Sequence, residues 1–256
     1  IHGGSGKDNL DGGAGFDVAS YKGATNGIKF DLTGDQTAFY KSTKGNYFTS
    51  DQVSNFEGVI GTPTWDVLIG NDTDNYLAGG AGVDTINGGA GHDIINGGSG
   101  NDNLDGGAGF DIASYEGDVY SVLFDLRGDQ TALLKYKGNY FTSDQVSNFE
   151  GVIGTSTSDV LIGNDTDNYF VGGAGDDAFT GGGGADQFVF KAGSGHDVIF
   201  DYLVGTDQLS IDTALIDNLS FDQVGNDVRI DLGVDSSITL QGVHLNQFVV
   251  EDYLFS

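Results

Sequence analysis

The chain has 256 residues, of which 44 are glycine, and 38 acidic against 10 basic residues give a formal net charge of −28. So much glycine excludes a helical bundle, because glycine destabilises helix interiors, and so much negative charge excludes nucleic acid as a partner. The chain has no cysteine, hence neither disulfides nor thiolate metal sites, and no apolar run long enough to be a transmembrane segment. Either the chain is disordered or cations neutralise it.

A nine-residue unit, G-G-x-G-x-D-x-U-x with U a large apolar residue, begins at Gly3 and recurs along the chain. It fits two units in Gly3–Ser20, six in Gly61–Ser114 and four in Gly154–Val189, and a weaker unit follows at Ala192–Phe200. The eighth position is apolar in all twelve regular units. The sixth position, including that of the weaker unit, is occupied by Asp8, Asp17, Asp66, Asn75, Asp84, Asp93, Asp102, Asp111, Asp159, Asn168, Asp177, Asp186 and Asp197.

A longer period overlies the short one. The segment "GGSGKDNLDGGAGFDVASY" at Gly3 returns at Gly97 as "GGSGNDNLDGGAGFDIASY". In this register Ile1 and His2 align with Ile95 and Asn96, the last two letters of a unit. We therefore expect the chain to begin inside a repeat, as a piece of a longer protein would.

The chemistry of one unit favours a stacked β-structure. Glycine permits positive φ and close backbone approach, so the turn can point carbonyl oxygens inward beside the aspartate oxygens. The three residues x-U-x suffice for a short strand, and only the middle side chain can face a core. One unit cannot bury that side chain alone, so units must stack. Two units per coil predict an all-β parallel roll, whose facing oxygens need a hard cation between them.

Two aromatic-rich inserts, Tyr21–Ile60 and Tyr115–Ile153, interrupt the repeats. "IKFDL" at Ile28 and "VLFDL" at Val122 are typical of strands, as are "NYFTSDQV" and "NFEGVIG" in each insert. We expect these strands to pack on the roll; a sugar-binding face made of their aromatic side chains is the alternative. Near the C-terminus, "VGNDVRIDL" predicts a hairpin at Gly225-Asn226, within a β cap over the end of the roll.

The repeat resembles the RTX (repeats-in-toxin, haemolysin-type) family, and the end of the chain resembles the C-terminal region of type I secreted proteins. The resemblance implies a parallel β-roll that binds several Ca²⁺ ions between turns one coil apart, so that Asp84 would stack with Asp102 and Asp93 with Asp111. The predicted aspartate ligands are Asp8, Asp17, Asp66, Asp84, Asp93, Asp102, Asp111, Asp159, Asp177, Asp186 and Asp197, with Asp201 and Asp207 in the flank after the repeats. The predicted glycine ligands are Gly79, Gly82, Gly88, Gly91, Gly97, Gly100, Gly106, Gly109, Gly172, Gly175 and Gly181.

Four units depart from this pattern, because those beginning at Gly61, Gly70, Gly154 and Gly163 lack the second and fourth glycines. We expect these units to keep their strands and to bind Ca²⁺ weakly or not at all. The best ion-binding ladder is therefore predicted at Gly79–Ser114.

The predicted organisation has four segments: a first roll segment with its insert (1–60), a second with the homologous insert (61–153), a third (154–200) and a β cap with a secretion-signal-like end (201–256). We expect a non-enzymatic, secreted bacterial protein that folds on Ca²⁺ after export by type I secretion machinery. Two alternatives are the non-catalytic C-terminal part of a secreted protease, lipase or polysaccharide lyase or epimerase, and a segment of an adhesin or surface-layer protein. Polysaccharide and the cell surface stay open as partners.

Overall fold

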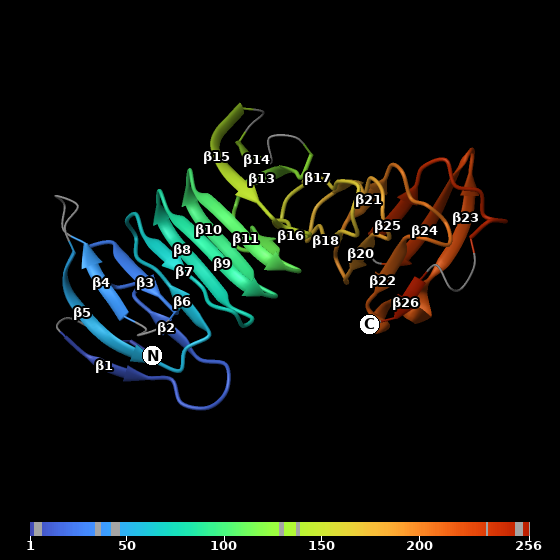
Figure 1. Ribbon diagram of the computed structural model, residues 1–256. Coiled ribbons are helices and arrows are strands. Elements are labelled where there is room, and N and C mark those ends of the chain that lie inside the picture. Colours follow the sequence, from blue (N-terminus) through green and yellow to red (C-terminus); the bar gives the residue numbers. More distant parts are fainter. Residues whose placement is uncertain are drawn as a thin grey trace. The chain divides into compact units, whose positions relative to one another are not determined.

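The computed structural model describes residues 1–2, 7–33, 37–41, 47–127, 131–136, 139–233, 235–248 and 253–255. Its described elements are β-strands apart from one short 3-10 helix, η1 (Thr213–Asn218) (Figure 1). The chain divides into two compact units: unit 1 is Ile1–Ser114 with Thr142–Phe149, and unit 2 is Tyr115–Phe141 with Glu150–Ser256. In the described part of the chain, no helix is long and apolar enough to cross a membrane. The four-segment division predicted from the sequence stays a prediction.

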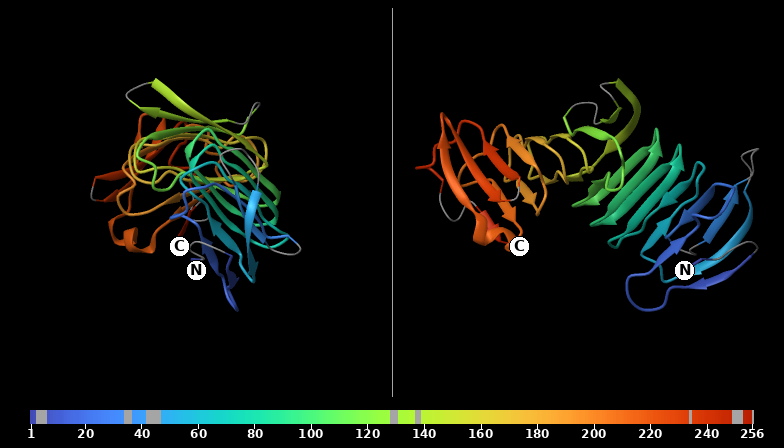
Figure 2. Two further views of the ribbon diagram at one scale, coloured as in Figure 1. Left: turned by 90° about the vertical axis from the view of Figure 1, so that its left-hand side faces the viewer. Right: turned by 180° about the vertical axis from the view of Figure 1, so that it is seen from behind.

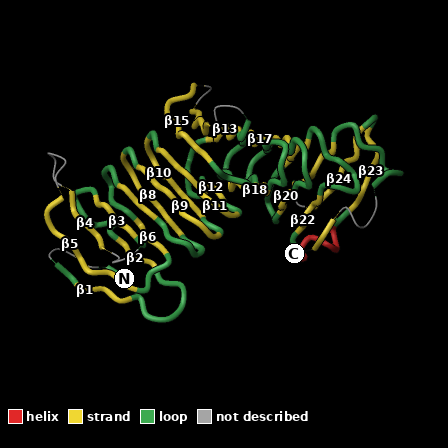
Figure 3. The backbone as a smooth tube through the Cα atoms, viewed as in Figure 1, coloured by secondary structure: helices red, strands yellow, loops and turns green. Residues whose placement is uncertain are grey.

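Unit 1 consists of two sheets that are parallel except at the insert. Sheet A of this unit has the order β1 (Asn9–Asp11), β5 (Tyr47–Ser54), β4 (Thr37–Lys41), β3 (Ile28–Asp31), β7 (Val67–Ile69), β9 (Thr85–Gly91) and β11 (Asn103–Gly109), after which comes β15 (Asn139–Ser147). Sheet B has the order β2 (Val18–Ser20), β6 (Gly58–Ile60), β8 (Tyr76–Gly82), β10 (Ile94–Gly100) and β12 (Ile112–Ser114). The chain alternates between the sheets through turns, drawn green in Figure 3.

The register within each sheet confirms the predicted parallel β-roll. Leu77 pairs with Ile95 and Ile95 with Ala113 in sheet B, while Ile86 pairs with Leu104 in sheet A, so partners are 18 residues apart. One coil thus contains two nine-residue units. All the predicted inward side chains are buried, namely Leu10, Ala19, Leu68, Leu77, Ile86, Ile95, Leu104, Ala113, Leu161, Phe170, Phe179 and Phe188. The core is therefore the thin seam of eighth-position side chains between the sheets.

The strands of the central ladder are longer than the predicted three residues. The strands β8, β9, β10 and β11 have seven residues each, because they run on through the glycines of the following turn. Gly80 pairs with Gly98 and Gly82 with Gly100, so the backbones of adjacent turns stay in parallel register. Identical turns stacked directly on one another extend the pairing beyond the strand that their sequence alone predicts.

The first insert forms a meander within the roll rather than a separate layer. Strand β4 is antiparallel to both β3 and β5, and the three strands lie between β1 and β7 in sheet A. Three of its aromatic side chains pack inward: Tyr21, Phe30 and Phe56 are buried, and the rings of Tyr21 and Phe30 meet edge to face at 5.8 Å, whereas Phe39 is partly exposed. The predicted strands are thus present, and these aromatic side chains contribute to the core.

Unit 2 repeats this plan and ends in a cap (Figure 2). Sheet A of unit 2 has the order β14 (Thr131–Tyr136), β13 (Ser121–Asp125), β17 (Val160–Ile162), β19 (Ala178–Thr180), β21 (His196–Ile199), β25 (Ser236–Leu240), β24 (Asp227–Gly233) and β23 (Ser220–Val224). Sheet B has the order β16 (Gly151–Ile153), β18 (Tyr169–Val171), β20 (Gln187–Phe190), β22 (Gln208–Ile211) and β26 (Tyr253–Phe255). Strands β23 and β24 form the predicted hairpin, with Val224 opposite Asp227 across Gly225-Asn226. The acidic pair Glu251-Asp252 of the predicted secretion-signal-like end lies outside the described residues.

The core of unit 2 is aromatic where the ladder of unit 1 is aliphatic. Phe170 stacks on Phe188 at 5.2 Å, and both meet Phe179 edge to face. Since such aromatic pairs contribute roughly 0.5–1.5 kcal/mol beyond the area that they bury, this seam contributes more per coil than leucine and alanine do.

Candidate metal centre

The sixth-position side chains of unit 1 form two hydrogen-bonded files, one before each sheet. In file A, the turns before sheet A, the Asp66 amide donates to Asp84 Oδ1 at 2.6 Å and the Asp84 amide to Asp102 Oδ1 at 2.8 Å. In file B, the turns before sheet B, the Asp93 amide donates to Asp111 Oδ1 at 2.8 Å, and the Asn75 amide donates to Asp93 Oδ1 at 2.7 Å. Each carboxylate is thereby fixed by the coil before it, and the predicted pairs Asp84–Asp102 and Asp93–Asp111 are adjacent.

Unit 2 contains the same two files. The Asp159 amide donates to Asp177 Oδ1 at 2.8 Å and the Asp177 amide to Asp197 Oδ1 at 2.9 Å. In file B, Asp186 accepts from the Asn168 amide at 2.9 Å, and its own amide donates to Asp207 Oδ1 at 3.1 Å. Asp197 thus continues the file, although its turn matches the repeat only weakly.

Turns that have both the second and the fourth glycine are here called complete turns. In Gly79–Asp84, Gly80 and Gly82 have φ of +108° and +127°, which a residue with a Cβ rarely adopts. The first glycine is needed for a different reason, because a Cβ at Gly79 would overlap the Asp84 carboxylate. The turn therefore closes around the aspartate and directs no amide of its own toward the second carboxylate oxygen.

The second carboxylate oxygen of several complete turns is buried without a protein donor. Among the described residues, Oδ2 of Asp84, Asp93, Asp177 and Asp197 is buried and has no hydrogen-bond partner. These four residues are at most 2% exposed. An ionised oxygen in such a place is strongly destabilising unless a cation or a proton satisfies it.

The four turns that lack the second and fourth glycines satisfy the same position internally, and they are here called self-closed turns. The Thr62 amide donates to Asp66 Oδ2 at 2.6 Å, and the Thr62 hydroxyl donates to Asp66 Oδ1 at 3.1 Å. Thr155 and Asp159 repeat both bonds at 2.6 and 3.0 Å. The two remaining self-closed turns close through an asparagine, with the Asn71 amide bonded to Asn75 Oδ1 at 2.8 Å and the Asn164 amide to Asn168 Oδ1 at 2.9 Å.

The highest pKa values belong to carboxylates of complete turns, although Asp93 of such a turn, at about 6, equals Asp159 of a self-closed turn. Burial raises the pKa of Asp177 to about 8; the bond from the Asp159 amide opposes this rise, and repulsion from Asp159 and Asp197 adds to it. Asp84 has a pKa of about 8 for the same main reason. Burial also raises the pKa of Asp159, but only to about 6, because the Thr155 and Val122 amides and the Thr155 hydroxyl stabilise its charge. Asp84 and Asp177 therefore have a greater need for a counter-charge than Asp159.

The remaining predicted ligands have different surroundings. Asp8 Oδ2 is buried without a partner, but Gly3–Gly6 of its turn lie outside the described residues. Asp201 is exposed and accepts the Gly181 and Gly182 amides, both at 2.9 Å, and Asp207 Oδ2 accepts the Leu203 amide at 2.7 Å. Asp17 lies in the complete turn that contains Gly13 and Gly15. The predicted glycines Gly79, Gly82, Gly88, Gly91, Gly97, Gly100, Gly106, Gly109, Gly172, Gly175 and Gly181 all lie in complete turns.

Sequence reasoning missed the carboxylates that continue the files through the inserts. The Asp8 amide donates to Asp51 Oδ1, and the Asp102 amide to Asp144 Oδ1, both at 2.9 Å. Asp51 Oδ2 also accepts the Tyr21 hydroxyl at 3.1 Å, so a tyrosine contacts the oxygen that complete turns leave unsatisfied. In file B the Asp17 amide donates to Glu57 Oε2 at 2.9 Å. The available signal was "TSDQV", which both inserts contain.

The donor set fits a hard divalent cation. No group of three or more acidic, histidine or cysteine side chains in the described ranges is arranged to hold a metal. An ion at a complete turn would therefore need backbone carbonyl oxygens besides the aspartates, and Ca²⁺ accepts such mixed sets of six to eight oxygens. The buried, unpartnered Oδ2 atoms are the observation that supports this fit.

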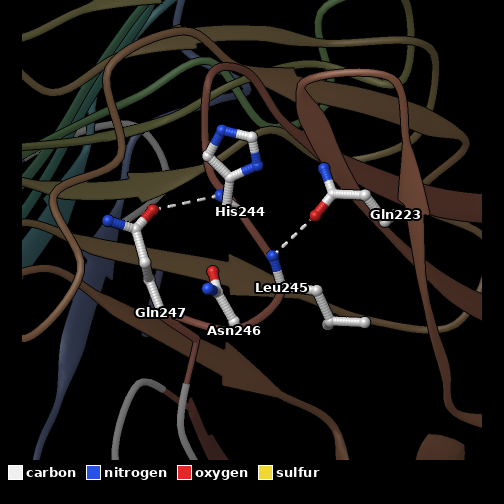
Figure 4. A pocket seen from close by; sticks show the side chains of 5 residues that line it. All are labelled: Gln223, His244, Leu245, Asn246 and Gln247. Atoms are coloured by element: carbon white, nitrogen blue, oxygen red, sulfur yellow. Dashed lines mark hydrogen bonds between the residues drawn. The ribbon is translucent and has the colours of Figure 1, made fainter.

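A pocket in the cap of unit 2 is lined by Gln223, His244, Leu245, Asn246 and Gln247 (Figure 4). Gln223 Oε1 accepts the Leu245 amide at 2.7 Å, and the His244 amide donates to Gln247 Oε1 at 3.3 Å. Gln223 Nε2 donates to the Asp227 carbonyl at 2.9 Å. These hydrogen bonds of Gln223 and Gln247 connect the last turns of the cap. No carboxylate is among the residues that line the pocket, so it offers no charged ligand to a cation.

Comparison with known proteins confirms the resemblance to the RTX family. The model of the RTX calcium-binding nonapeptide repeat matches four times, at residues 1–19, 60–95, 79–113 and 153–188. The comparison with curated proteins found no match. A crystal structure of the extracellular lipase LipA from Serratia marcescens is similar with a TM-score of 0.34 and 22% identity, over 78% of this chain and 40% of the lipase chain. The chain thus spans less than half the length of that lipase.

Proposed function

The chain contains RTX calcium-binding nonapeptide repeats, and we propose that it is a secreted β-roll whose complete turns bind Ca²⁺ and fold around it outside the cell. The observation that carries this proposal is the row of buried Oδ2 atoms without partners, which includes Asp84, Asp93 and Asp177. Each belongs to a complete turn with another complete turn one coil further on. A divalent ion between two such turns would neutralise carboxylates that burial otherwise disfavours.

Three turn pairs are the main proposed sites. They are the turns of Asp84 and Asp102, of Asp93 and Asp111, and of Asp177 and Asp197, which the amide-to-carboxylate bonds join in each case. In each pair the aspartates would supply charged oxygens and the glycine-rich backbone would supply carbonyl oxygens. Asp66 and Asp159 accept hydrogen bonds from their own turns at both oxygens, so we assign them turn closure rather than primary ligation.

The net charge of −28 connects ion binding to folding and export. Without a counter-ion, acidic self-repulsion opposes the compact roll, and an extended chain suits passage through a type I secretion channel. Extracellular calcium modules bind with Kd of about 10⁻⁴–10⁻³ M, which suits the high Ca²⁺ outside cells and keeps the sites empty in the cytosol. Binding to the folded state alone then stabilises that state by mass action.

Calorimetric titration and far-UV circular dichroism of the full chain test this proposal. We expect Ca²⁺ to add β-structure to an EDTA-treated chain and to bind at several sites, whereas Mg²⁺, which demands a tighter octahedral shell, should do so weakly. Equal β-content with EDTA and with Ca²⁺, and no heat of binding, would contradict it.

The whole protein's role is a separate part of the proposal. RTX repeats are structural, and we assign this chain no reaction of its own. As the C-terminal part of a secreted hydrolase or lyase, the purified chain should show no activity on casein, esters or alginate. As an adhesin or surface-layer segment, it should form larger particles in Ca²⁺ than in EDTA, which light scattering detects.

A further inference from the structure

We infer that each unit contains one coil that closes without any ion, so that removing Ca²⁺ unfolds the complete-turn ladder but leaves a folded nucleus in each unit. This inference rests on the proposed function, since it divides the turns by their need for Ca²⁺. The two coils are residues 61–78, with strands β7 and β8, and residues 154–171, with strands β17 and β18. Each consists only of self-closed turns.

The turns of these coils have the hydrogen bonds that an ion would otherwise replace. In the 61–78 coil, Thr62 bonds both oxygens of Asp66 through its amide and hydroxyl. In the next turn of that coil, the side-chain amide Nδ2 of Asn75 donates to Asn71 Oδ1 at 3.2 Å, and the Thr73 hydroxyl donates to the same atom at 2.7 Å. The side chains of Asp66 and Asn75 have no buried polar atom without a partner. Burial at these turns is therefore compensated by the protein itself.

The insert of unit 1 adds hydrophobic support and further hydrogen bonds to the 61–78 coil. Phe30 of β3 pairs with Leu68 of β7, and Val59 of β6 pairs with Leu77 of β8, all four being fully buried. The amide of Ile28 donates to Asp66 Oδ1 at 2.7 Å. Burial of these large apolar side chains stabilises the fold without any cation.

Unit 2 repeats the arrangement in a different sequence context. Phe124 of β13 pairs with Leu161 of β17, and Val152 of β16 pairs with Phe170 of β18, again with all four side chains buried. The amide of Val122 donates to Asp159 Oδ1 at 2.8 Å, as that of Ile28 does in unit 1. The combination of insert and self-closed coil is thus a repeated module.

The coils that follow in unit 1 lack this internal closure of their turns, and in sheet A an insert strand, β15, pairs with them at the far end, beside β11. In Gly79–Ser114 each nine-residue unit places one aliphatic side chain inward, and Asp84 and Asp93 have a buried oxygen with no partner. Ionised and without Ca²⁺, such an oxygen destabilises the coil by more than the burial of one leucine or isoleucine offsets. The boundary between the ion-free nucleus and the ion-dependent ladder in unit 1 therefore lies between Ala78 and Gly79.

Amide hydrogen exchange of the full chain, read by mass spectrometry in EDTA and in Ca²⁺, tests the inference. In EDTA we expect peptides from 58–78 and 154–171 to exchange at least about tenfold more slowly than peptides from 79–114, which should gain protection only in Ca²⁺. Equal loss of protection in all three regions in EDTA, with recovery in Ca²⁺, overturns the inference and leaves the proposed function standing. Equal protection of all three regions in both buffers overturns the inference and the proposed function together.

A hydroxyl deletion makes the test specific to the self-closed turns. The double variant Thr62→Val/Thr155→Val removes the hydroxyl donors to Asp66 and Asp159 while keeping β-branched side chains. We expect about tenfold faster exchange in EDTA at 58–78 and 154–171, and an unchanged ladder in Ca²⁺, which shows that the variant still folds. Thr85→Val, at an exposed position of β9, is the matched control and should leave exchange in EDTA as it is. Identical exchange of the double variant and the control in EDTA overturns the inference.

Discussion

The coil 61–78 and the ladder 79–114 follow the same nine-residue period and the same 18-residue register. They differ in whether the protein donates hydrogen bonds to both oxygens of the carboxylate at the sixth position. In the coil, the Asp66 carboxylate is bonded by the amide and hydroxyl of Thr62. In the ladder, Asp84 Oδ2 has no protein donor. The period therefore sets the coil, whereas turns with and without glycine at positions two and four differ in whether the protein supplies a donor to the second carboxylate oxygen.

The cause of this difference is backbone conformation. Gly80 and Gly82 have positive φ, which turns the peptide groups of a complete turn away from the aspartate. A threonine is not found there: the three described non-glycine residues with positive φ are Asn55, Asn148 and Asp235, none of them in a self-closed turn. Threonine thus keeps the amide of position two directed at the carboxylate, and we expect two substitutions per turn to convert one kind of turn into the other.

The largest effect is expected from truncating core side chains, one beside a self-closed coil and one in the ladder. Phe124→Ala, in the insert that supports the 154–171 coil, should destabilise unit 2 by about 3–5 kcal/mol and remove the part of the residual β-signal in EDTA that comes from unit 2. Leu104→Ala, in the ladder, should cost about 2–5 kcal/mol in Ca²⁺ and leave the EDTA spectrum unchanged. Urea denaturation followed by circular dichroism in both buffers measures this. A loss of EDTA signal in Leu104→Ala equal to that in Phe124→Ala would remove the distinction.

The second contrast concerns pH in the metal-free chain. Burial raises the pKa of Asp84 and Asp177 to about 8 and that of Asp197 to about 7, so the folded state binds protons more tightly than the unfolded state does. The stability that these groups contribute is complete below their ordinary pKa near 4 and is lost as pH rises through 7 to 8. A chain stripped of metal should therefore be more folded at pH 5 than at pH 8, by circular dichroism.

In Ca²⁺ the dependence on pH should reverse, because the ion and the proton compete for the same carboxylates and binding releases protons. Apparent Ca²⁺ affinity should rise between pH 6 and pH 8. A metal-free chain that is better folded at pH 8 than at pH 5 would show that these carboxylates are not buried as described.

The sequence was sufficient for the roll and for the ladder, because both follow from local repetition. The invariant apolar eighth position, from Leu10 to Phe188, predicts the seam, and two units per coil predict the 18-residue register. The sequence was insufficient to predict that carboxylates of the inserts join the files. Asp51 and Asp144 join the files only because the β5 and β15 strands pair with β1 and β11, and such long-range pairing leaves no periodic signal. The closure of Asp66 by Thr62 also needed atomic geometry, since the sequence shows only that two glycines are missing.

A third test changes the charge at one ladder position. Asp93→Asn keeps an oxygen that can accept the Asn75 amide but removes the charge, as Asn75 and Asn168 already do in self-closed turns. We expect weaker Ca²⁺ binding by about tenfold or more at one site, or about 1.5–3 kcal/mol, and one ion fewer at moderate Ca²⁺. Isothermal titration calorimetry measures both. Asp72→Asn, in an exposed part of a self-closed turn, is the matched control, and an equal loss in the two variants would contradict the assignment.

The smallest expected effect converts one kind of turn into the other. Thr155→Gly/Thr157→Gly rewrites "GTSTSD" at Gly154 as "GGSGSD", which has both glycines of a complete turn and lies one coil before the complete turn of Asp177. The variant loses the Thr155 hydroxyl bonds to Asp159 and gains backbone freedom, so it should lose about 1–2 kcal/mol of stability in EDTA. It should also bind one more Ca²⁺ ion, because Asp159 Oδ2 no longer accepts the amide of a threonine. Thr85→Gly/Thr180→Gly, which removes two strand threonines outside the turns, controls for glycine alone and should lose stability without gaining an ion. An unchanged ion count in the converted turn would mean that the second and fourth glycines do not create the site, and that the difference between ladder and coil has another origin.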